Sequence, residues 1–425
     1  MPFFYRCRAQ PAEPKLSREG GLARCPILKE TARSMRLLHA INSLDPKLGG
    51  TVEVVRAFAN EQSRQGLKVD VLTLEAPDRP WFSRLAAPVI ALGPSKLGLF
   101  SYNNRLMNWL RVHRDDYDAI ILHGMWDYTC LGGLRGLRDG ATSWFLYPHG
   151  MLDPWFEGFR VKHVKKTIYW KLWGQHILRE ADGVIFTAED EQLLAPTSFQ
   201  PFVVRGMIAT LGTDAPDPDS DRYRELFFET YPQLVGKQLA IFLGRNHPKK
   251  GLELLISALG NLAPQYPLLH VVIAGPEDDA QKTILQAQAT QLGVTDRILW
   301  AGFVSEDLRA GARYSGGLFV LSSHSENFGL SVVESLACGQ PVLVTNKVNI
   351  WREIDRYGAA FVGSDTVADT TASLKHYLDM PEAEFAQMQQ NARRCFEECF
   401  YLPVVTQRLT EMLQQRIAER RASAK

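Results

Sequence analysis

The sequence predicts an α/β protein built from two Rossmann-like, doubly wound domains that face each other across a cleft. Its 425 residues exceed one ordinary hydrophobic core and fit two domains of roughly 150–200 residues each. Short apolar runs alternate with amphipathic helical patterns, as in parallel sheets joined by right-handed crossovers. This layout, about five strand–helix units, occurs on both sides of a segment rich in proline and aspartate near residues 212–222.

Apolar runs of strand length mark both predicted sheets. In the first half they lie at 36–41, 68–74, 118–123, 143–147 and 183–187, and in the second half at 238–243, 269–274, 298–301, 317–321 and 341–345. Amphipathic patterns between them predict helices, most clearly at 50–65 and 251–262, and a last helical pattern covers 383–419.

These elements divide the chain into four parts. We expect a disordered extension at 1–34, a first domain at 35–212, a second domain at 213–390, and a helix at 391–425 that crosses back to the first domain. Residues 1–34 lack both periodicity and the apolar core of a signal peptide, while Met35 opens the first strand. An upstream start codon is therefore a second interpretation of this extension.

The composition excludes several classes of protein. Hydrophobic residues make up 45% and charged residues 22% of the chain, as in ordinary globular proteins. A formal net charge of +1 creates no field that would attract nucleic acid. The six cysteines form no CxxC pair, which indicates reduced cytosolic thiols rather than disulfides or a metal site. No apolar run is long enough for a transmembrane helix, so we expect a cytoplasmic protein.

The segment Ser322–Val344 is the strongest candidate for a binding site. Its apolar strand ends in a polar loop, Gly329 permits an unusual turn, and Leu330–Ala337 has the pattern of a helix. Glu326 lies on the loop and Glu334 about one turn inside the helix, so both can face one ligand. Carboxylates accept hydrogen bonds from vicinal hydroxyls, and free amides near Gly329 suit phosphate oxygens. Alternatively, Glu326 caps the helix and Glu334 lies on its surface.

Two cations follow the first predicted strand of the second domain. Arg245 and Lys250 lie in the loop between that strand and a helix that begins near Gly251. Both would stand beside a helix N-terminus whose amides favour anions, which suits a diphosphate leaving group. A solvated basic loop is the alternative.

Gly49 and Gly50 follow the first strand and would let the backbone approach a phosphate or sugar closely. The surrounding sequence is neither GxGxxG nor a Walker loop, which argues against nicotinamide and ATP sites. Any tight turn would also use such glycines.

Two histidines end strands of the first domain. His123 and His149 are each followed by glycine at the edge where the cleft should lie. Either could hydrogen-bond a sugar hydroxyl or transfer a proton, and His149 is the better candidate. A structural role remains the alternative for both.

Residues 155–176 mix aromatic and basic side chains. Such a helix could lie on an anionic membrane surface. It could equally pack its aromatic rings inside the domain and leave its lysines in water.

With these residues in view, the chain from Met35 onward resembles the retaining GT-B glycosyltransferases of family four, often described as glycosyl transferases group 1. The most specific matches are the Glu-x7-Glu element from Glu326 to Glu334 and the loop from Gly244 to Gly251. Also similar are Gly49–Gly50 and the turns at 274–276 and 302–304, and the string from Pro148 to Trp155 resembles members that assemble bacterial exopolysaccharide and lipopolysaccharide.

The resemblance implies that the second domain binds a nucleotide-sugar donor and the first domain its acceptor. Arg245 and Lys250 would bind the diphosphate, Glu334 the ribose, and the turn from Gly302 to Val304 the base. Glu326 would hold the sugar, together with the amides of Asn327, Phe328, Gly329 and Leu330. His149 would contact the sugar near the reacting carbon, and Gly49 and Gly50 would line the diphosphate from the opposite domain.

The resemblance also implies the reaction. A hexose would pass from a UDP- or GDP-linked donor to a hydroxyl of a glycan or lipid-linked acceptor with retention of configuration, in cell-surface polysaccharide synthesis. No DxD element follows a strand, which agrees with the metal-independent habit of this fold, and no further cofactor is expected. Leu211–Asp214 replaces the usual Asn-Gly-Val-Asp at the domain hinge, which puts the shape of that loop in doubt.

Other functions remain open. A nucleotide-sugar epimerase, hydrolase or phosphorylase could use the same scaffold. A two-lobed, non-catalytic sugar-binding protein would normally carry a secretion signal, and none is evident here.

Overall fold

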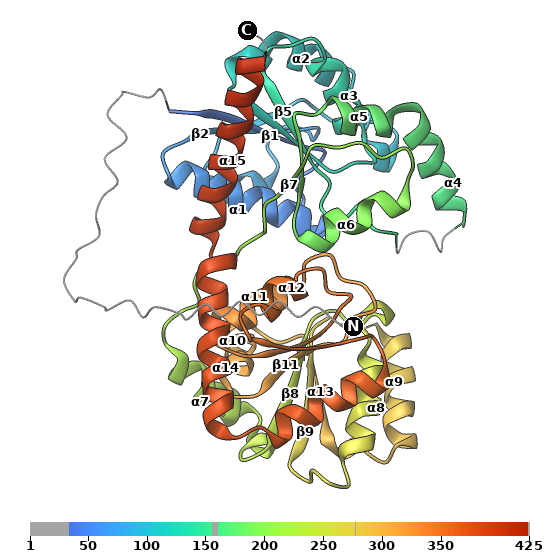
Figure 1. Cartoon of the computed structure of the whole chain (residues 1–425), viewed down its shortest axis with the longest axis vertical. Helices are drawn as coiled ribbons and strands as arrows, with labels where there is room; N and C mark the ends of the chain where they lie inside the picture. Colours follow the sequence, from blue (N-terminus) through green and yellow to red (C-terminus); the bar gives the residue numbers. More distant parts are fainter. Residues whose placement is uncertain (1–33, 155–159, 277, 424–425) are drawn as a thin grey trace, which may run out of the picture. The chain divides into compact units, whose positions relative to one another are not determined.

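The computed structural model describes residues 34–154, 160–276 and 278–423, and for residues 160–163 the backbone alone. Met35 begins a compact unit that contains two separate parallel sheets, as Figure 1 shows. Apart from Ser34, the extension predicted at 1–34 lies outside the described residues. We call the parts of the chain built on the two sheets the first and the second domain.

Seven parallel strands form the sheet of the first domain. Their order is β3-β2-β1-β4-β5-β6-β7. The central strands are buried on both faces, which explains why they are apolar throughout. The strands are β1 (Arg36–Ile41), β2 (Lys68–Thr73), β3 (Val89–Ala91), β4 (Ala119–His123), β5 (Ser143–Tyr147), β6 (Gly183–Phe186) and β7 (Gly206–Ile208).

Six parallel strands form the sheet of the second domain, in the order β10-β9-β8-β11-β12-β13. The switch from β8 to β11 places the loops after these two strands side by side at one edge. The strands are β8 (Gln238–Leu243), β9 (Leu269–Ala274), β10 (Ile298–Gly302), β11 (Leu318–Leu321), β12 (Val342–Thr345) and β13 (Ala360–Gly363).

The predicted fold class of two parallel α/β domains is confirmed, and every predicted strand is present within a residue or two. Three strands were not predicted, namely β3, β7 and β13. Each lies at or next to the edge of its sheet, has only three or four residues, and is mostly half-buried. Because such short, partly exposed strands need no continuous apolar run, they leave little signal in a sequence.

Helices cover both sheets. In the first domain they are α1 (Gly50–Arg64), α2 (Leu106–His113), α3 (Tyr128–Leu137), α4 (Arg160–Tyr169), α5 (Gln175–Glu180) and α6 (Glu189–Ser198). In the second domain they are α7 (Ser220–Thr230), α8 (Leu252–Leu262), α9 (Asp279–Gln291), α10 (Glu306–Tyr314), α11 (Leu330–Ala337), α12 (Trp351–Asp355) and α13 (Val367–Asp379), and α14 (Glu382–Cys395) and α15 (Leu402–Ser423) follow.

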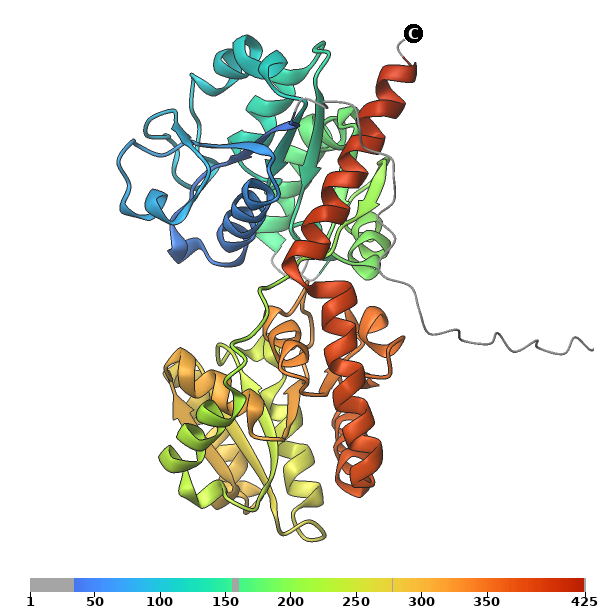
Figure 2. The ribbon, with the colours of Figure 1, turned by 90° about the vertical axis from the view of Figure 1, so that its left-hand side faces the viewer.

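The helical pattern predicted at 383–419 is two helices, not one. A π-helical turn at Phe396–Phe400 and an extended Tyr401 separate α14 from α15, which follow one another in Figure 2. At this break the chain pairs with the connection between the sheets, because Thr213 donates to the Phe400 carbonyl at 3.0 Å and accepts from the Leu402 amide at 3.0 Å.

Helix α15 packs on the first domain beside α1 (Figure 1). Gln65 in the loop after α1 donates to the Pro403 carbonyl at 2.9 Å. Near the other end of α15, Arg420 pairs with Asp182 and donates to the Gly140 carbonyl at 2.6 Å.

Gly212 should be required where the segment between the two sheets meets the break between α14 and α15. A Cβ at this position would lie 2.6 Å from the Phe400 carbonyl oxygen and 2.7 Å from Val405. We expect Gly212→Ala to cost about 2 kcal/mol and to lower the melting temperature by several degrees. Gly50→Ala is the control, because a Cβ there meets no atom within 4 Å. Equal melting temperatures for the two variants would contradict the expected clash.

Candidate functional site

The ends of β8 and β11 bring together residues that are far apart in the sequence. Lys250 follows β8 and Glu326 follows β11, and their side chains form an ion pair that is about four-fifths buried. The loops themselves are joined, because the Ser322 hydroxyl donates to the Gly251 carbonyl at 2.7 Å and the His324 amide to the Lys249 carbonyl at 2.9 Å. The structure therefore places two predicted site residues in direct contact.

Gly251 is required for this contact. Its φ of +63° lies in the left-handed region. A Cβ on Gly251 would also lie 1.9 Å from the Ser322 carbonyl oxygen, which is far inside van der Waals contact. Any other residue would force the loop of Lys250 away from the loop of Glu326.

The N-terminus of α11 has the form of an anion site. Gly329 precedes the helix with a φ of +78°, and no side chain caps the first turn. The amides of Leu330 and the next residue therefore keep the donor capacity that a helix N-terminus offers to a phosphate. Asn327 and Phe328 lie on the same loop; Phe328 is buried against Phe400, so only its backbone can serve a ligand.

Glu334 is held by a residue that was not predicted. Arg313, at the end of α10, is buried and pairs with the carboxylate of Glu334, whose side chain stays 30% exposed. Arg313 also approaches Glu306 at 3.5 Å. In the sequence Arg313 is one more charged residue on an amphipathic helix, and only the packing of α10 beside α11 reveals its role.

The turn after β10 presents a different side chain from the one expected. Val304 belongs to the hydrophobic core, whereas Phe303 is 78% exposed. The side chain of Val304 therefore cannot face a ligand, and a base at this turn would meet the Val304 backbone or the ring of Phe303.

The loop after β8 contains one further unpredicted feature. The side chain of Arg245 is exposed, while its neighbour Asn246 is buried. Neither polar atom of the Asn246 amide has a hydrogen-bond partner within the described part of the chain. Because such buried groups are rare, Asn246 joins the candidate residues of this loop.

In the first domain, Gly49 and Gly50 stand at the start of α1, as predicted. Gly49 has a φ of +84°, and a Cβ on either glycine would meet no heavy atom within 4 Å. A ligand could therefore approach the backbone closely at this turn.

His149 lies on a tight turn after β5 with a φ of +51°, unusual for a residue other than glycine. Glu191 holds this turn, since its carboxylate accepts from the Gly150 amide at 2.7 Å and from the Thr187 amide at 2.6 Å. Burial raises the pKa of Glu191 despite these hydrogen bonds. Glu191 was not predicted, because a glutamate in a first helical turn is ordinary in a sequence.

The prediction that His123 itself binds a sugar hydroxyl is wrong. Its side chain is fully buried, and both ring nitrogens are occupied by other histidines, His39 and His149, each at 2.8 Å. The ring therefore has no free polar atom for a ligand.

The turn of His149 meets the second domain at Asn327. A Cβ on Gly150 would lie 2.4 Å from the side chain of Asn327, so this side chain packs directly on the Gly150 backbone. The Asn327 amide also donates to the Thr187 hydroxyl at 3.2 Å. Two predicted site elements, one from each domain, thus lie next to each other.

A set of polar contacts between α6 and α12 also joins the domains. Asp190 accepts from the Trp351 indole and from Arg352, both at 2.6 Å, and Glu189 pairs with Arg356 at 2.6 Å. Beside these contacts lies a cavity of about 550 Å³, and its lining includes Leu193 as well as His324 and Lys347.

The region predicted either to touch a membrane or to pack its aromatic rings inside the domain contains both buried aromatic rings and exposed apolar side chains, and membrane contact stays a prediction. Residues 155–159 and the side chains of 160–163 lie outside the described residues. Of the described aromatic residues, Tyr169 and Trp170 are buried. On the outer side Val164, Ile168 and Leu172 are each more than half exposed. Val164 and Ile168 are four residues apart on one face of α4, and Leu172 follows in the π-helical segment Trp170–Gly174.

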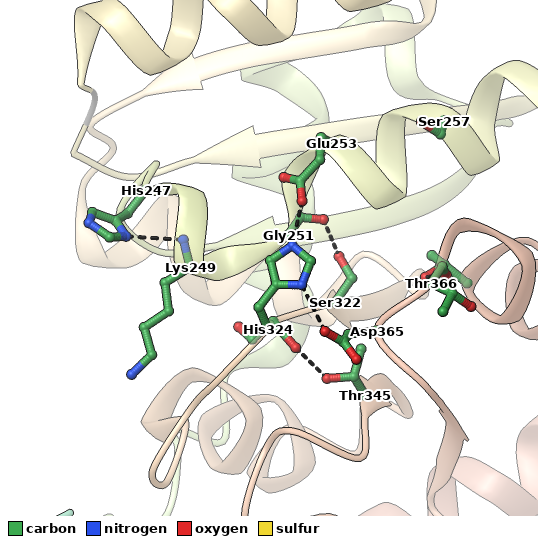
Figure 3. Close-up of polar contacts among 12 residues, drawn as sticks. His247, Lys249, Gly251, Glu253, Ser257, Ser322, His324, Thr345, Asp365 and Thr366 are labelled. Carbon is green, nitrogen blue, oxygen red and sulfur yellow. Dashed lines mark hydrogen bonds and ion pairs between the residues drawn. The ribbon is translucent and has the colours of Figure 1, made fainter. Parts of the chain in front are cut away.

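His324 braces the loop that carries Glu326. Figure 3 shows its ring between two carboxylates, with Glu253 at 2.6 Å and Asp365 at 2.9 Å. Burial alone would lower the pKa of His324, but hydrogen bonds to both carboxylates and their negative charges raise it overall. The protonated ring therefore ties α8 and the loop after β13 to the loop after β11.

This brace should weaken as the pH rises. The raised pKa means that His324 contributes most to stability below its ordinary pKa of about 6.5, and that this contribution is lost as the pH passes through the higher folded-state value. We expect His324→Gln to lower the free energy of unfolding by about 1 kcal/mol at pH 6 and by less at pH 9. The effect is small because the ring is partly exposed to solvent. Urea unfolding of both proteins at the two pH values measures this. A cost that grows with pH would contradict the assignment.

Two family profiles match most of the chain between them. The profile of glycosyl transferases group 1 matches residues 224–394, and the profile of the glycosyl transferase 4-like domain matches residues 49–202. Mannosylfructose-phosphate synthase of Agrobacterium fabrum is 33% identical over 147 residues, which are 33% of this chain and 32% of that protein. D-inositol 3-phosphate glycosyltransferase of Gordonia bronchialis is 29% identical over 234 residues, 52% of this chain and 49% of that protein. The chain thus spans about a third to a half of the length of these relatives.

Solved structures share the fold. Anabaena HepE in complex with UDP has a TM-score of 0.71 and 18% identity, over 90% of this chain and 100% of that chain. Sucrose-phosphate synthase from Thermosynechococcus elongatus has a TM-score of 0.67 and 17% identity, over 91% of this chain and 100% of that one. These likenesses confirm the GT-B arrangement of two parallel-sheet domains.

Among the residues that the structure describes, no helix is both long and apolar enough to cross a membrane.

One family profile covers the first domain and the other the second, and the fold agrees with both. The protein therefore belongs to the glycosyl transferases group 1, with a glycosyl transferase 4-like domain in its first half.

Proposed function

We propose that this protein transfers a hexose from a UDP- or GDP-linked donor to a hydroxyl of a glycan or lipid-linked acceptor, with retention of configuration. The observation that carries the proposal is the Lys250–Glu326 ion pair beside the uncapped N-terminus of α11. It combines a cation and backbone amides for a diphosphate with a carboxylate for sugar hydroxyls.

The pair can exchange partners when a donor binds. A diphosphate would take the ammonium of Lys250, with Arg245 exposed on the same loop. Glu326 would then be free to accept hydrogen bonds from the sugar. As the bond to the sugar breaks, negative charge grows on the leaving phosphate, and Lys250 and the α11 amides stabilise it. That phosphate is also the proposed base for the acceptor hydroxyl.

Glu334 and Arg313 serve the proposed ribose site. The Arg313 guanidinium is buried and holds the carboxylate of Glu334 in a fixed orientation. A fixed carboxylate can accept hydrogen bonds from two vicinal hydroxyls, the group that a ribose offers. The exposed ring of Phe303 at the next strand end could stack on the base.

The solved relatives support a nucleotide-sugar donor. HepE is described in complex with UDP and with UDP-glucose. WaaG, which has a TM-score of 0.57 and 15% identity over 89% of this chain and 99% of that one, is described as a glycosyltransferase of lipopolysaccharide biosynthesis. We propose by analogy that this protein also acts in cell-surface polysaccharide synthesis.

Two other functions would leave different results. An epimerase or hydrolase would consume the donor without an acceptor, whereas a transferase needs the acceptor for full turnover. A non-catalytic sugar-binding protein would bind the donor and leave it intact. The cavity lined by His324 and Ser325, on the loop that leads to Glu326, offers space for a second substrate, which favours transfer.

Removing either member of the central pair should abolish most transfer. We expect Lys250→Ala and Glu326→Ala each to lower kcat/KM by about 10²–10³. The assay would measure release of UDP or GDP from UDP-glucose, UDP-galactose and GDP-mannose in the presence of glycan acceptors. Lys375→Ala is the control, because its ammonium pairs with Asp379 on the exposed face of α13. Full activity in both site variants, with the control also active, would contradict the assignment of this site.

We also propose that the exposed stripe on α4 and the π-helical segment that follows it, Trp170–Gly174, contacts an anionic membrane surface. Val164, Ile168 and Leu172 supply apolar area, and the exposed lysines at 165 and 171 supply positive charge. Changing the three apolar residues to serine should reduce sedimentation with phosphatidylglycerol vesicles several-fold, because each side chain loses buried apolar area. Val112→Ser is the control, being an exposed valine on α2. Undiminished vesicle binding of the triple variant would exclude this surface.

A further inference from the structure

Three histidine rings and one amide form a single hydrogen-bonded line inside the first domain. His149 Nε2 lies 2.8 Å from His123 Nδ1, His123 Nε2 lies 2.8 Å from His39 Nδ1, and His39 Nε2 lies 2.8 Å from Gln62 Oε1. The line starts on α1 and crosses β1 and β4 to reach the turn after β5. Neighbouring rings stack with centroids 5.1 Å apart, and Tyr147 covers His149 at 4.1 Å.

All three rings are neutral. Burial lowers the pKa of His39 to about 4 and that of His149 to about 3, and it also lowers the pKa of His123 well below its ordinary value. A positive charge on one ring would also oppose a charge on the next. A neutral imidazole has one N–H and one lone pair, so each hydrogen bond in the line decides which nitrogen carries the hydrogen on the next ring.

The Gln62 end sets the direction of the line. Oε1 of Gln62 can only accept, so His39 must carry its hydrogen on Nε2 and present a lone pair at Nδ1. His123 then donates from Nε2, and its own Nδ1 accepts from Nε2 of His149. It follows that Nδ1 of His149 has a lone pair and no hydrogen.

This last nitrogen is one unpaired end of the line, and Nε2 of Gln62 is unpaired at the other end within the described residues. Within the described part of the chain, Nδ1 of His149 is buried and has no hydrogen-bond partner. A buried polar atom left unpaired costs about 1–3 kcal/mol, so such an atom in a site points to a partner that the ligand supplies. The turn that carries it lies against Asn327 of the second domain. Relative motion of two domains, the usual behaviour of such interfaces, would open a path to it.

We propose that Gln62, His39 and His123 are positioning residues that hold His149 in its Nε2–H tautomer, so that Nδ1 accepts a hydrogen bond from a hydroxyl of the donor sugar. The proposal rests on the proposed function. It assigns specificity, because a lone pair at that place accepts a hydroxyl and repels a carboxylate. A donor sugar that carries a carboxylate in place of that hydroxyl should therefore bind more weakly than the neutral hexose.

The line does not conduct protons out of the site. A proton that entered at His149 would have to leave at Gln62, and an amide oxygen is too weakly basic to take it. The burial that keeps the rings neutral opposes every charged intermediate along the line. Its role is to fix orientation and tautomer.

The tautomer can be observed directly. In the full chain labelled with 15N-histidine, the signals of His149 are assigned by their loss in His149→Gln. We expect Nδ1 of His149 to be pyridine-like in the wild type. In Gln62→Leu and His39→Phe, which remove the acceptors that set the direction, this signal should shift towards a pyrrole-like or averaged value. Gln65→Leu, after the end of the same helix, should leave it unchanged.

Binding provides the second measurement. The probe is whichever of UDP-glucose, UDP-galactose and GDP-mannose raises the wild-type melting temperature most. Gln62→Leu and His39→Phe should weaken its binding about tenfold, the effect of one hydrogen bond, while binding of the free nucleotide diphosphate stays unchanged. The matching uronic acid, UDP-glucuronic acid for a glucose donor, should bind the wild type at least tenfold more weakly.

Each outcome decides between the two proposals. A pyrrole-like Nδ1 in the wild type, as expected if the Gln62 amide donated instead, would overturn this inference and leave the transferase untouched. The same holds if both variants keep the wild-type signal and affinity. Conversely, failure of every nucleotide sugar to bind or react would reject the proposed function, while the NMR signal would still report the tautomer. Two variants at different places in the line guard against a folding defect in one of them.

Discussion

The contact between the loops after β8 and β11 is the constraint on which the candidate site depends. These strands are neighbours in the sheet although about 75 residues separate them in the chain, from Leu243 to Leu318. Gly251 permits the contact, since only a residue without a Cβ fits against the Ser322 carbonyl. The Lys250–Glu326 pair, the start of α11 and the ring of His324 all take their places from this approach.

The two domains treat the ionisable side chains of the site in different ways. The second domain pairs its site carboxylates with cations, Glu326 with Lys250 and Glu334 with Arg313. The first domain does the opposite, because it buries histidines far enough to keep them neutral. A donor bound between them would meet charge at its phosphates and neutral hydrogen-bonding groups at its sugar, which matches the chemistry of a nucleotide sugar.

The prediction from sequence succeeded where a local pattern sets the structure. Strand lengths, the helix at Leu330–Ala337 and the turn at Gly329 follow from apolar runs and glycine positions over a few residues. It failed for Arg313, Glu191 and Asn246, which look like ordinary surface or turn residues in the chain. Their importance comes from burial and from partners contributed by distant segments. His123 ends its strand as predicted, but its role was not predicted correctly. The sequence of an apolar strand that ends in histidine does not show which groups the ring will contact.

The sequence by itself determined two parallel α/β domains, their order, and the residue types at the carboxyl edge of each sheet. It did so because alternation of apolar runs, helical periodicity and glycine are local properties of the chain. Only the tertiary structure decided which of those residues meet: that Lys250 faces Glu326, that Arg313 holds Glu334, and that His149 ends a line begun at Gln62. Such contacts depend on the sheet order and on the packing of α1 and α10 against their sheets, and neither is written in any short stretch of sequence.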